Sequence, residues 1–89
     1  MARMDMAFVD KADIAGGNAA AETLFNLGMM YCIGREVEPD LVSAHKWFNL
    51  AALRGNEEAR QYRLEISQEM SPEEIAEAQR QARDWMSMN

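Results

Sequence analysis

The sequence predicts an all-α fold, and three observations support that prediction. Apolar residues recur at intervals of three and four along most of the chain, as on one face of a helix. Runs of β-branched residues are absent, and glycine, proline and asparagine separate the periodic segments. The chain has 89 residues, of which 48% are hydrophobic and 27% charged. These values suit one small soluble globular domain, residues 1–89.

The first half of the chain predicts a weak helix and then a clear one. Residues 4–14 have the spacing of a short helix, and Gly16, Gly17 and Asn18 interrupt it. Residues 19–33 predict the first clear helix, with an inner face at i, i+3, i+4 and i+7 formed by Leu24, Leu27, Gly28 and Tyr31. Gly34 then provides a C-terminal stop.

The second half predicts three more helices. One opens at Glu38-Pro39-Asp40, with proline in the first turn, and runs to about Arg54 before Gly55 and Asn56. Another covers roughly residues 57–69. The last begins at Ser71-Pro72-Glu73-Glu74, where Ser71 and Glu74 can form a capping box. We expect the tail after Trp85 to fray.

Small residues predict that the two helices over 19–54 pack closely. Gly28 lies in mid-helix, where glycine costs about 1 kcal/mol relative to alanine and therefore needs a packing reason. We expect Gly28 to face Ala44 or Ala51 of the following helix, and Trp47 and Phe48 to seal the pair against the next one. Two short patterns also recur 38 positions later, Gly-Asn-x-x-Ala from residue 17 and Ala-x-x-Trp from residue 44, as in a two-helix repeat.

These residues resemble the signature of the Sel1-like repeat family, relatives of the tetratricopeptide repeats. The matching positions are Leu27, Gly28, Tyr31, Gly34, Val37, Asp40, Ala44, Trp47, Ala51, Ala52, Gly55 and Ala59. The resemblance implies a short right-handed α-solenoid of two antiparallel helical hairpins, with a full repeat at 19–54, a capping repeat at 55–89 and an N-terminal segment at 1–18. Glu36 stands where the family usually has a second glycine, which predicts a distorted or differently built turn.

By the same resemblance, the chain is a protein–protein interaction module, an adaptor or scaffold of bacterial type that is not an enzyme. The first helix of the hairpin lines a concave face, which gives a partner-binding set of Glu22, Phe25, Met29, Cys32 and Ile33. Phe25, Met29, Cys32 and Ile33 form an apolar stripe that suits a protein or peptide partner. Two alternatives remain open: residues 4–14 or a second subunit could cover the stripe, and the chain could be a structural homodimer without a separate ligand.

Charge and composition argue against other classes of function. A net charge of −6 disfavours binding to nucleic acid and to anionic membranes. Cys32 has no cysteine or histidine at metal-ligand spacing, so we expect no metal and no cofactor. His45, the one histidine, is expected on the solvated outer side of its helix. A single cysteine and the absence of a signal-peptide pattern or a membrane-spanning run predict the cytoplasm.

Overall fold

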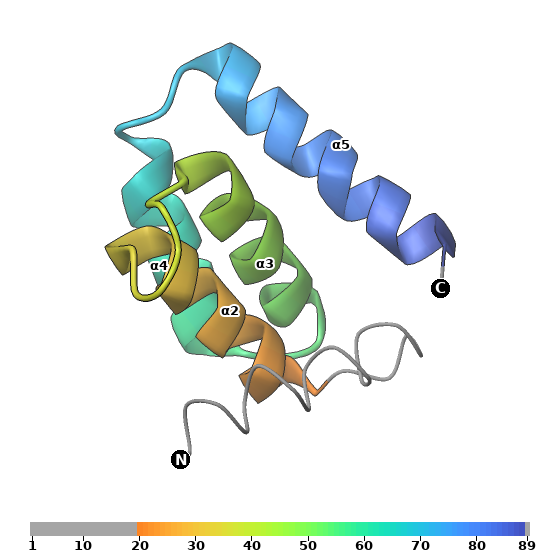
Figure 1. Cartoon of the computed structure of the whole chain (residues 1–89). Coiled ribbons are helices and arrows are strands. Elements are labelled where there is room, and N and C mark those ends of the chain that lie inside the picture. The colour runs from red at the N-terminus through yellow and green to blue at the C-terminus, as the bar shows by residue number, and fades with distance from the viewer. Residues whose placement is uncertain (1–19, 89) are drawn as a thin grey trace.

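The protein folds as four helices in the part of the chain that the structure describes. The computed structural model describes residues 20–88, and no strand occurs among them. The helices are α2 (Ala21–Ile33), α3 (Leu41–Leu53), α4 (Glu57–Ser67) and α5 (Pro72–Met88) (Figure 1). The predicted all-α class is therefore confirmed. The N-terminal segment 1–18 and the helix predicted at 4–14 lie outside the described residues.

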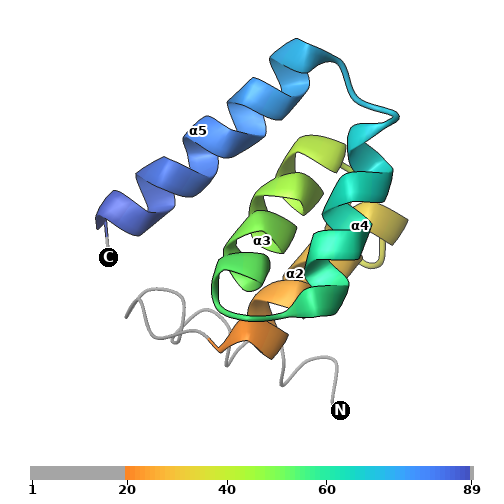
Figure 2. The same cartoon turned by 180° about the vertical axis from the view of Figure 1, so that it is seen from behind.

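α3 is the central helix of this arrangement. It packs against α2, α4 and α5, and it lies between α5 on one side and the pair of α2 and α4 on the other (Figures 1 and 2). α2 and α3 form the predicted close pair. α4 and α5 both pack more extensively on α3 than on each other, so the second pair is more open than the first. The consequence is one core shared by all four helices.

Side-chain caps define the starts of α3 and α4. The Asp40 carboxylate accepts hydrogen bonds from the Ser43 backbone N–H at 3.2 Å and from the Ser43 hydroxyl at 2.9 Å. Asn56 caps α4 in the same way, accepting from the Ala59 N–H at 2.8 Å. Pro39 therefore precedes the cap and does not sit in the first turn as predicted, because the Asp40 side chain supplies the acceptor that the first turn needs.

The predicted capping box at the start of α5 is confirmed. The Ser71 N–H donates to Glu74 Oε1 at 2.9 Å, and the Glu74 N–H donates to Ser71 Oγ at 3.1 Å. The prediction that the chain frays after Trp85 is wrong, since α5 continues to Met88. Trp85 is buried against α3, and that contact holds the last turns in place.

Phe48 stands at the centre of the core. It is fully buried, and its ring stacks on Tyr62 of α4 at 5.5 Å and meets Phe25 of α2 at 5.7 Å between centroids. A Cβ atom on Gly28 would lie 2.5 Å from two carbons of the same ring. Gly28 thus makes room for Phe48, whose ring lies nearest to it, where the sequence predicted Ala44 or Ala51. A flat aromatic ring, and not a small residue, fills the space above the glycine.

The repeat spacing of the sequence also appears as a contact. Trp47 of α3 and Trp85 of α5, which are 38 positions apart, meet edge to face at 5.8 Å between centroids. Ala44 and Ala82, with the same separation, are both buried. The recurring Ala-x-x-Trp pattern therefore marks equivalent core positions on two helices, as predicted. Trp47 and Phe48 seal the first pair of helices against α5 and α4 respectively.

The loop between α2 and α3 carries two left-handed residues. Gly34 has φ 77°, and its N–H and that of Arg35 both donate to the Met30 carbonyl at the end of α2. Glu36 has φ 67°, a conformation that glycine adopts freely and other L-residues rarely adopt. The turn predicted to be distorted or differently built therefore has, at Glu36, the backbone conformation that a glycine would adopt. Such a residue costs roughly 1 kcal/mol or more.

Candidate functional site

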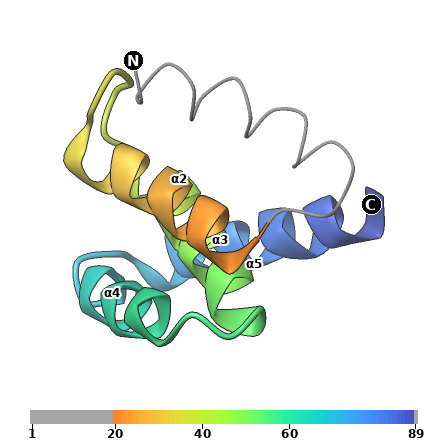
Figure 3. The same cartoon turned by 90° about the horizontal axis from the view of Figure 1, so that it is seen from below.

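α2 and α4 lie beside each other and run in the same direction (Figure 3). Phe25 of α2 contacts Tyr62 of α4 at 5.8 Å between ring centroids. At the other end of α2, the Cys32 thiol lies within the electrostatic influence of Glu65 and Glu69. Phe25 and Tyr62 are 37 positions apart, as are Cys32 and Glu69, which is close to the 38-residue recurrence of the sequence. We call this surface the α2–α4 face, which comprises Glu22, Phe25, Met29, Cys32, Ile33, Tyr62, Glu65 and Glu69.

The five residues predicted from the sequence are not equally accessible on this face. Phe25, Met29 and Cys32 are half-buried and pack against the core, whereas Glu22 is exposed and Ile33 is 54% exposed. α4 provides part of their cover, since Tyr62 contacts Phe25 directly. The apolar stripe is therefore a partly covered row of side chains that ends in one exposed isoleucine.

Sequence reasoning missed the contribution of α4. Glu58, Tyr62 and Glu65 recur at intervals of four and three, which places them on one side of α4. Glu69 follows four positions later, in the turn after the helix. We call Glu58, Glu65 and Glu69 together the acidic side of α4. This spacing was visible in the sequence. The sequence does not show, however, that this side of α4 lies beside α2, because that depends on how the helices pack.

The acidic side of α4 affects the chemistry of the thiol. Partial burial, followed by the negative charges of Glu69 and Glu65, raises the pKa of Cys32 above its usual value. The thiol is therefore protonated near neutral pH. A protonated thiol is a poor nucleophile and a poor metal ligand, so Cys32 acts here as a small apolar side chain.

His45 is buried, and the prediction that it lies on the solvated side of its helix is wrong. It is 2% exposed, because α3 is covered on several sides. His45 Nε2 lies 3.1 Å from Ser67 Oγ, and that hydroxyl donates to the Arg63 carbonyl at 2.7 Å. Since the Ser67 proton is already used, Nε2–H must be the donor to Ser67, which leaves Nδ1 as an unprotonated acceptor. Nδ1 is buried and has no hydrogen-bond partner among the described residues.

The environment of His45 favours the neutral imidazole. Burial, and then the positive charge of Arg63, lowers the pKa of His45 below its ordinary value of 6.5. A neutral ring that is almost fully shielded from solvent can serve as a structural link between α3 and α4. It is not positioned to transfer a proton to a substrate.

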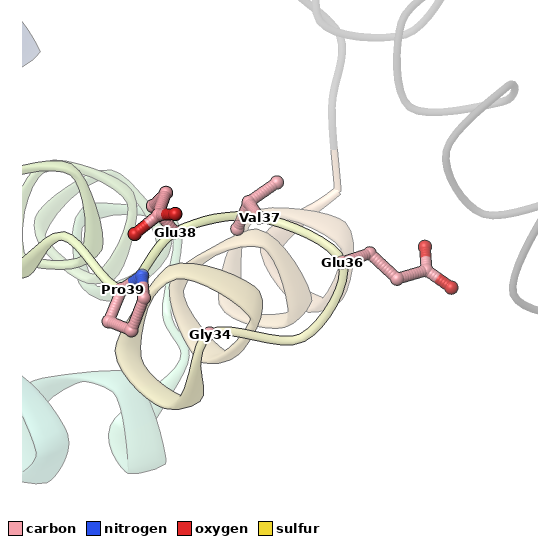
Figure 4. Close-up of a pocket in the computed structure, with 5 residues that line it drawn as sticks. All are labelled: Gly34, Glu36, Val37, Glu38 and Pro39. Atoms are coloured by element: carbon pink, nitrogen blue, oxygen red, sulfur yellow. The ribbon is translucent and has the colours of Figure 1, made fainter.

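A shallow hollow on the α2–α3 loop offers no second site. It is lined by Gly34, Glu36, Val37, Glu38 and Pro39 (Figure 4). The side chains of Glu36 and Glu38 point away from each other in that view, so no polar groups converge there. Across residues 20–88, no three His, Cys, Asp or Glu side chains come together as metal ligands. The helices of that range include none with the length and apolar character that a membrane crossing needs.

Comparison with known proteins places the α2–α3 pair in a family. Residues 21–56 match the family model described as Sel1 repeat, and this range contains α2, the loop, α3 and the turn that follows. No curated protein and no solved structure matches the chain. The α2–α4 face thus combines the first helix of the matched repeat with the helix that follows it.

Proposed function

The chain is a Sel1-like repeat protein whose matched repeat is residues 21–56, and from this premise we propose that it is an adaptor that binds a protein segment on its α2–α4 face. Sel1 repeats are generally protein–protein interaction modules. The observation that carries the proposal is the apolar row of Phe25, Met29 and Cys32, which remains half-buried at the surface and leads to the exposed Ile33. A partner's apolar side chains would bury this row further, which is favourable by about 25 cal/mol for each Å² removed from water.

An adaptor role also agrees with the chemistry of the two candidate reactive groups. Cys32 is a protonated thiol and His45 is a buried neutral imidazole, so neither is suited to catalysis. The proposal therefore includes the absence of enzymatic activity. A free cysteine also suits a reducing compartment, and we propose the cytoplasm of a bacterial cell.

A peptide-library selection against the folded chain tests the proposed face. Selected peptides are expected to shift the NMR signals of α2 and α4 and to bind at least tenfold more weakly to Ile33→Asp. Leu64→Asp is the matched control, because Leu64 is 61% exposed on α4 but does not share the spacing of Tyr62, Glu65 and Glu69. Signals that shift elsewhere, or equal losses in both variants, would contradict the proposal.

A second candidate function is homodimerisation, and a specific observation favours it. Arg54 lies over the Trp85 ring at 5.5 Å, which brings the C-terminal ends of α3 and α5 together. These two ends expose three large apolar side chains, Leu53, Met86 and Met88. Exposed apolar side chains at these ends could associate with the same side chains of a second copy.

Mass in solution separates the two candidates. The adaptor proposal expects a monomer at micromolar concentration by light scattering. A dimer that Leu53→Asp converts to a monomer, while Ile33→Asp leaves it intact, would favour the homodimer instead. Phe25→Glu is unsuitable for this test, because Phe25 contacts both Phe48 and Tyr62 and its replacement would disturb the core.

A further inference from the structure

We propose that the α2–α4 face is selective for a basic amphipathic segment, whose lysines or arginines face the acidic side of α4 while its apolar side chains pack on the row of α2. This inference rests on the proposed function, because it names the chemistry of the partner for the same face. It is carried by the distribution of charge around that row.

The acidic side of α4 is not neutralised within the described range. Glu58, Glu65 and Glu69 form no ion pair with any residue between 20 and 88 that carries a positive charge. The two arginines of α4 are directed elsewhere. Arg60 lies 4.0 Å from Glu57, and Arg63 donates to the Asn49 side chain of α3 at 2.6 Å.

α2 adds no positive charge to this face. Its sequence from Ala21 to Ile33 contains no lysine or arginine, and Glu22 is its one charged residue. The apolar row therefore lies between Glu22 at the start of α2 and the glutamates of α4. Burial is the main cause of the raised pKa of Cys32, and the charges of Glu69 and Glu65 raise it further, which agrees with a negative potential at the row itself.

This combination discriminates between partners. A basic segment gains attraction at the glutamates and burial at the apolar row together, whereas an acidic segment of equal hydrophobicity is repelled. Charges at the rim of an interface act mainly on the rate of association and on its salt dependence. We therefore expect affinity for basic segments that falls as salt is added.

The probe for this inference is a 14-residue helical peptide of leucine and lysine, compared with the same peptide in which glutamate replaces lysine. Fluorescence anisotropy is expected to show binding of the lysine peptide alone. Glu65→Gln combined with Glu69→Gln should weaken it about tenfold and reduce its salt dependence. The matched control is Glu57→Gln combined with Glu73→Gln, which changes the net charge equally at exposed sites off the face and should alter affinity by less than twofold.

Each outcome of this experiment is decisive. If both double variants bind the lysine peptide equally weakly, the peptide is attracted to the overall charge of the protein and the inference is overturned. The inference is also overturned if neither double variant changes the affinity. All four substitutions lie at exposed positions, and thermal unfolding checks that each variant is folded. If library peptides bind the face but are not basic, this inference fails while the proposed function stands. If no peptide binds the face, both fail.

Discussion

Replacing Gly28 with alanine tests whether Phe48 requires the missing Cβ. Two opposing effects determine the result. Alanine stabilises a helix interior by about 1 kcal/mol relative to glycine. The new Cβ would, however, lie 2.5 Å from Cδ1 and Cε1 of Phe48, well inside the 3.5–4.0 Å at which carbon atoms pack favourably.

The ring of Phe48 has little freedom to move away from this clash. It is fully buried and contacts Phe25 and Tyr62 on α2 and α4. Overpacking of this kind typically costs about 1–3 kcal/mol, and the net change in the free energy of unfolding also includes the helix gain. The difference between this cost and the helix gain is a destabilisation of up to about 2 kcal/mol, which we expect for Gly28→Ala.

Urea unfolding followed by the fluorescence of the two tryptophans measures this change, and a second background makes the test specific. In Phe48→Leu, the smaller side chain leaves room for the methyl group, so Gly28→Ala should there be neutral or stabilising by up to about 1 kcal/mol. Ala76→Gly at an exposed position of α5 calibrates the helix effect, with an expected loss of about 1 kcal/mol. If Gly28→Ala stabilises the native background, or destabilises both backgrounds equally, the packing argument is refuted.

Three further predictions concern the loop, the buried histidine and the last cap. Glu36→Gly should raise the free energy of unfolding by about 1 kcal/mol, because it relieves the left-handed backbone at φ 67°; a loss of stability in urea unfolding would contradict this. His45 has a lowered pKa in the folded state, so as the pH falls below about 6.5 the unfolded chain binds a proton at this histidine before the folded protein does. The free energy of unfolding therefore decreases over this pH range. His45→Gln keeps a donor near Ser67 but cannot titrate, so its stability should depend less steeply on pH between 7 and 5, and identical slopes would refute the assignment. Ser71→Ala should lower the free energy of unfolding by about 1 kcal/mol through loss of the capping box, and a thermal midpoint equal to that of the native protein would show that the box does not contribute.

The helices were predictable because residues close in the sequence determine where each helix begins and ends. Gly34, Asn56 and the Ser71–Glu74 pair each satisfy a helix end within four residues, so a short stretch of sequence contains the whole signal. The burial of His45 was not predictable in this way. Its hydrogen-bond partner Ser67 is 22 residues away, and an apolar pattern marks one face of a helix, whereas α3 is covered by three neighbours.

The candidate face could be predicted only in part for a related reason. The spacing of Phe25, Met29, Cys32 and Ile33 identifies their side of α2 without any knowledge of other helices. Which helix lies beside them depends on how successive repeat units stack. The 38-residue recurrence was sufficient to suggest equivalent positions on α4, and Phe25 and Tyr62 meet close to that separation.

The central position of α3 has a consequence for how the chain unfolds. Long repeat arrays can lose one unit at a time, because each unit contacts only its neighbours. Here α2, α4 and α5 all depend on one helix, so loosening α3 exposes Phe48, Trp47 and His45 to water in the same event. Residues 20–88 should therefore unfold in a single cooperative transition, with amide exchange in α3 slowest and no stable half-molecule to isolate by proteolysis.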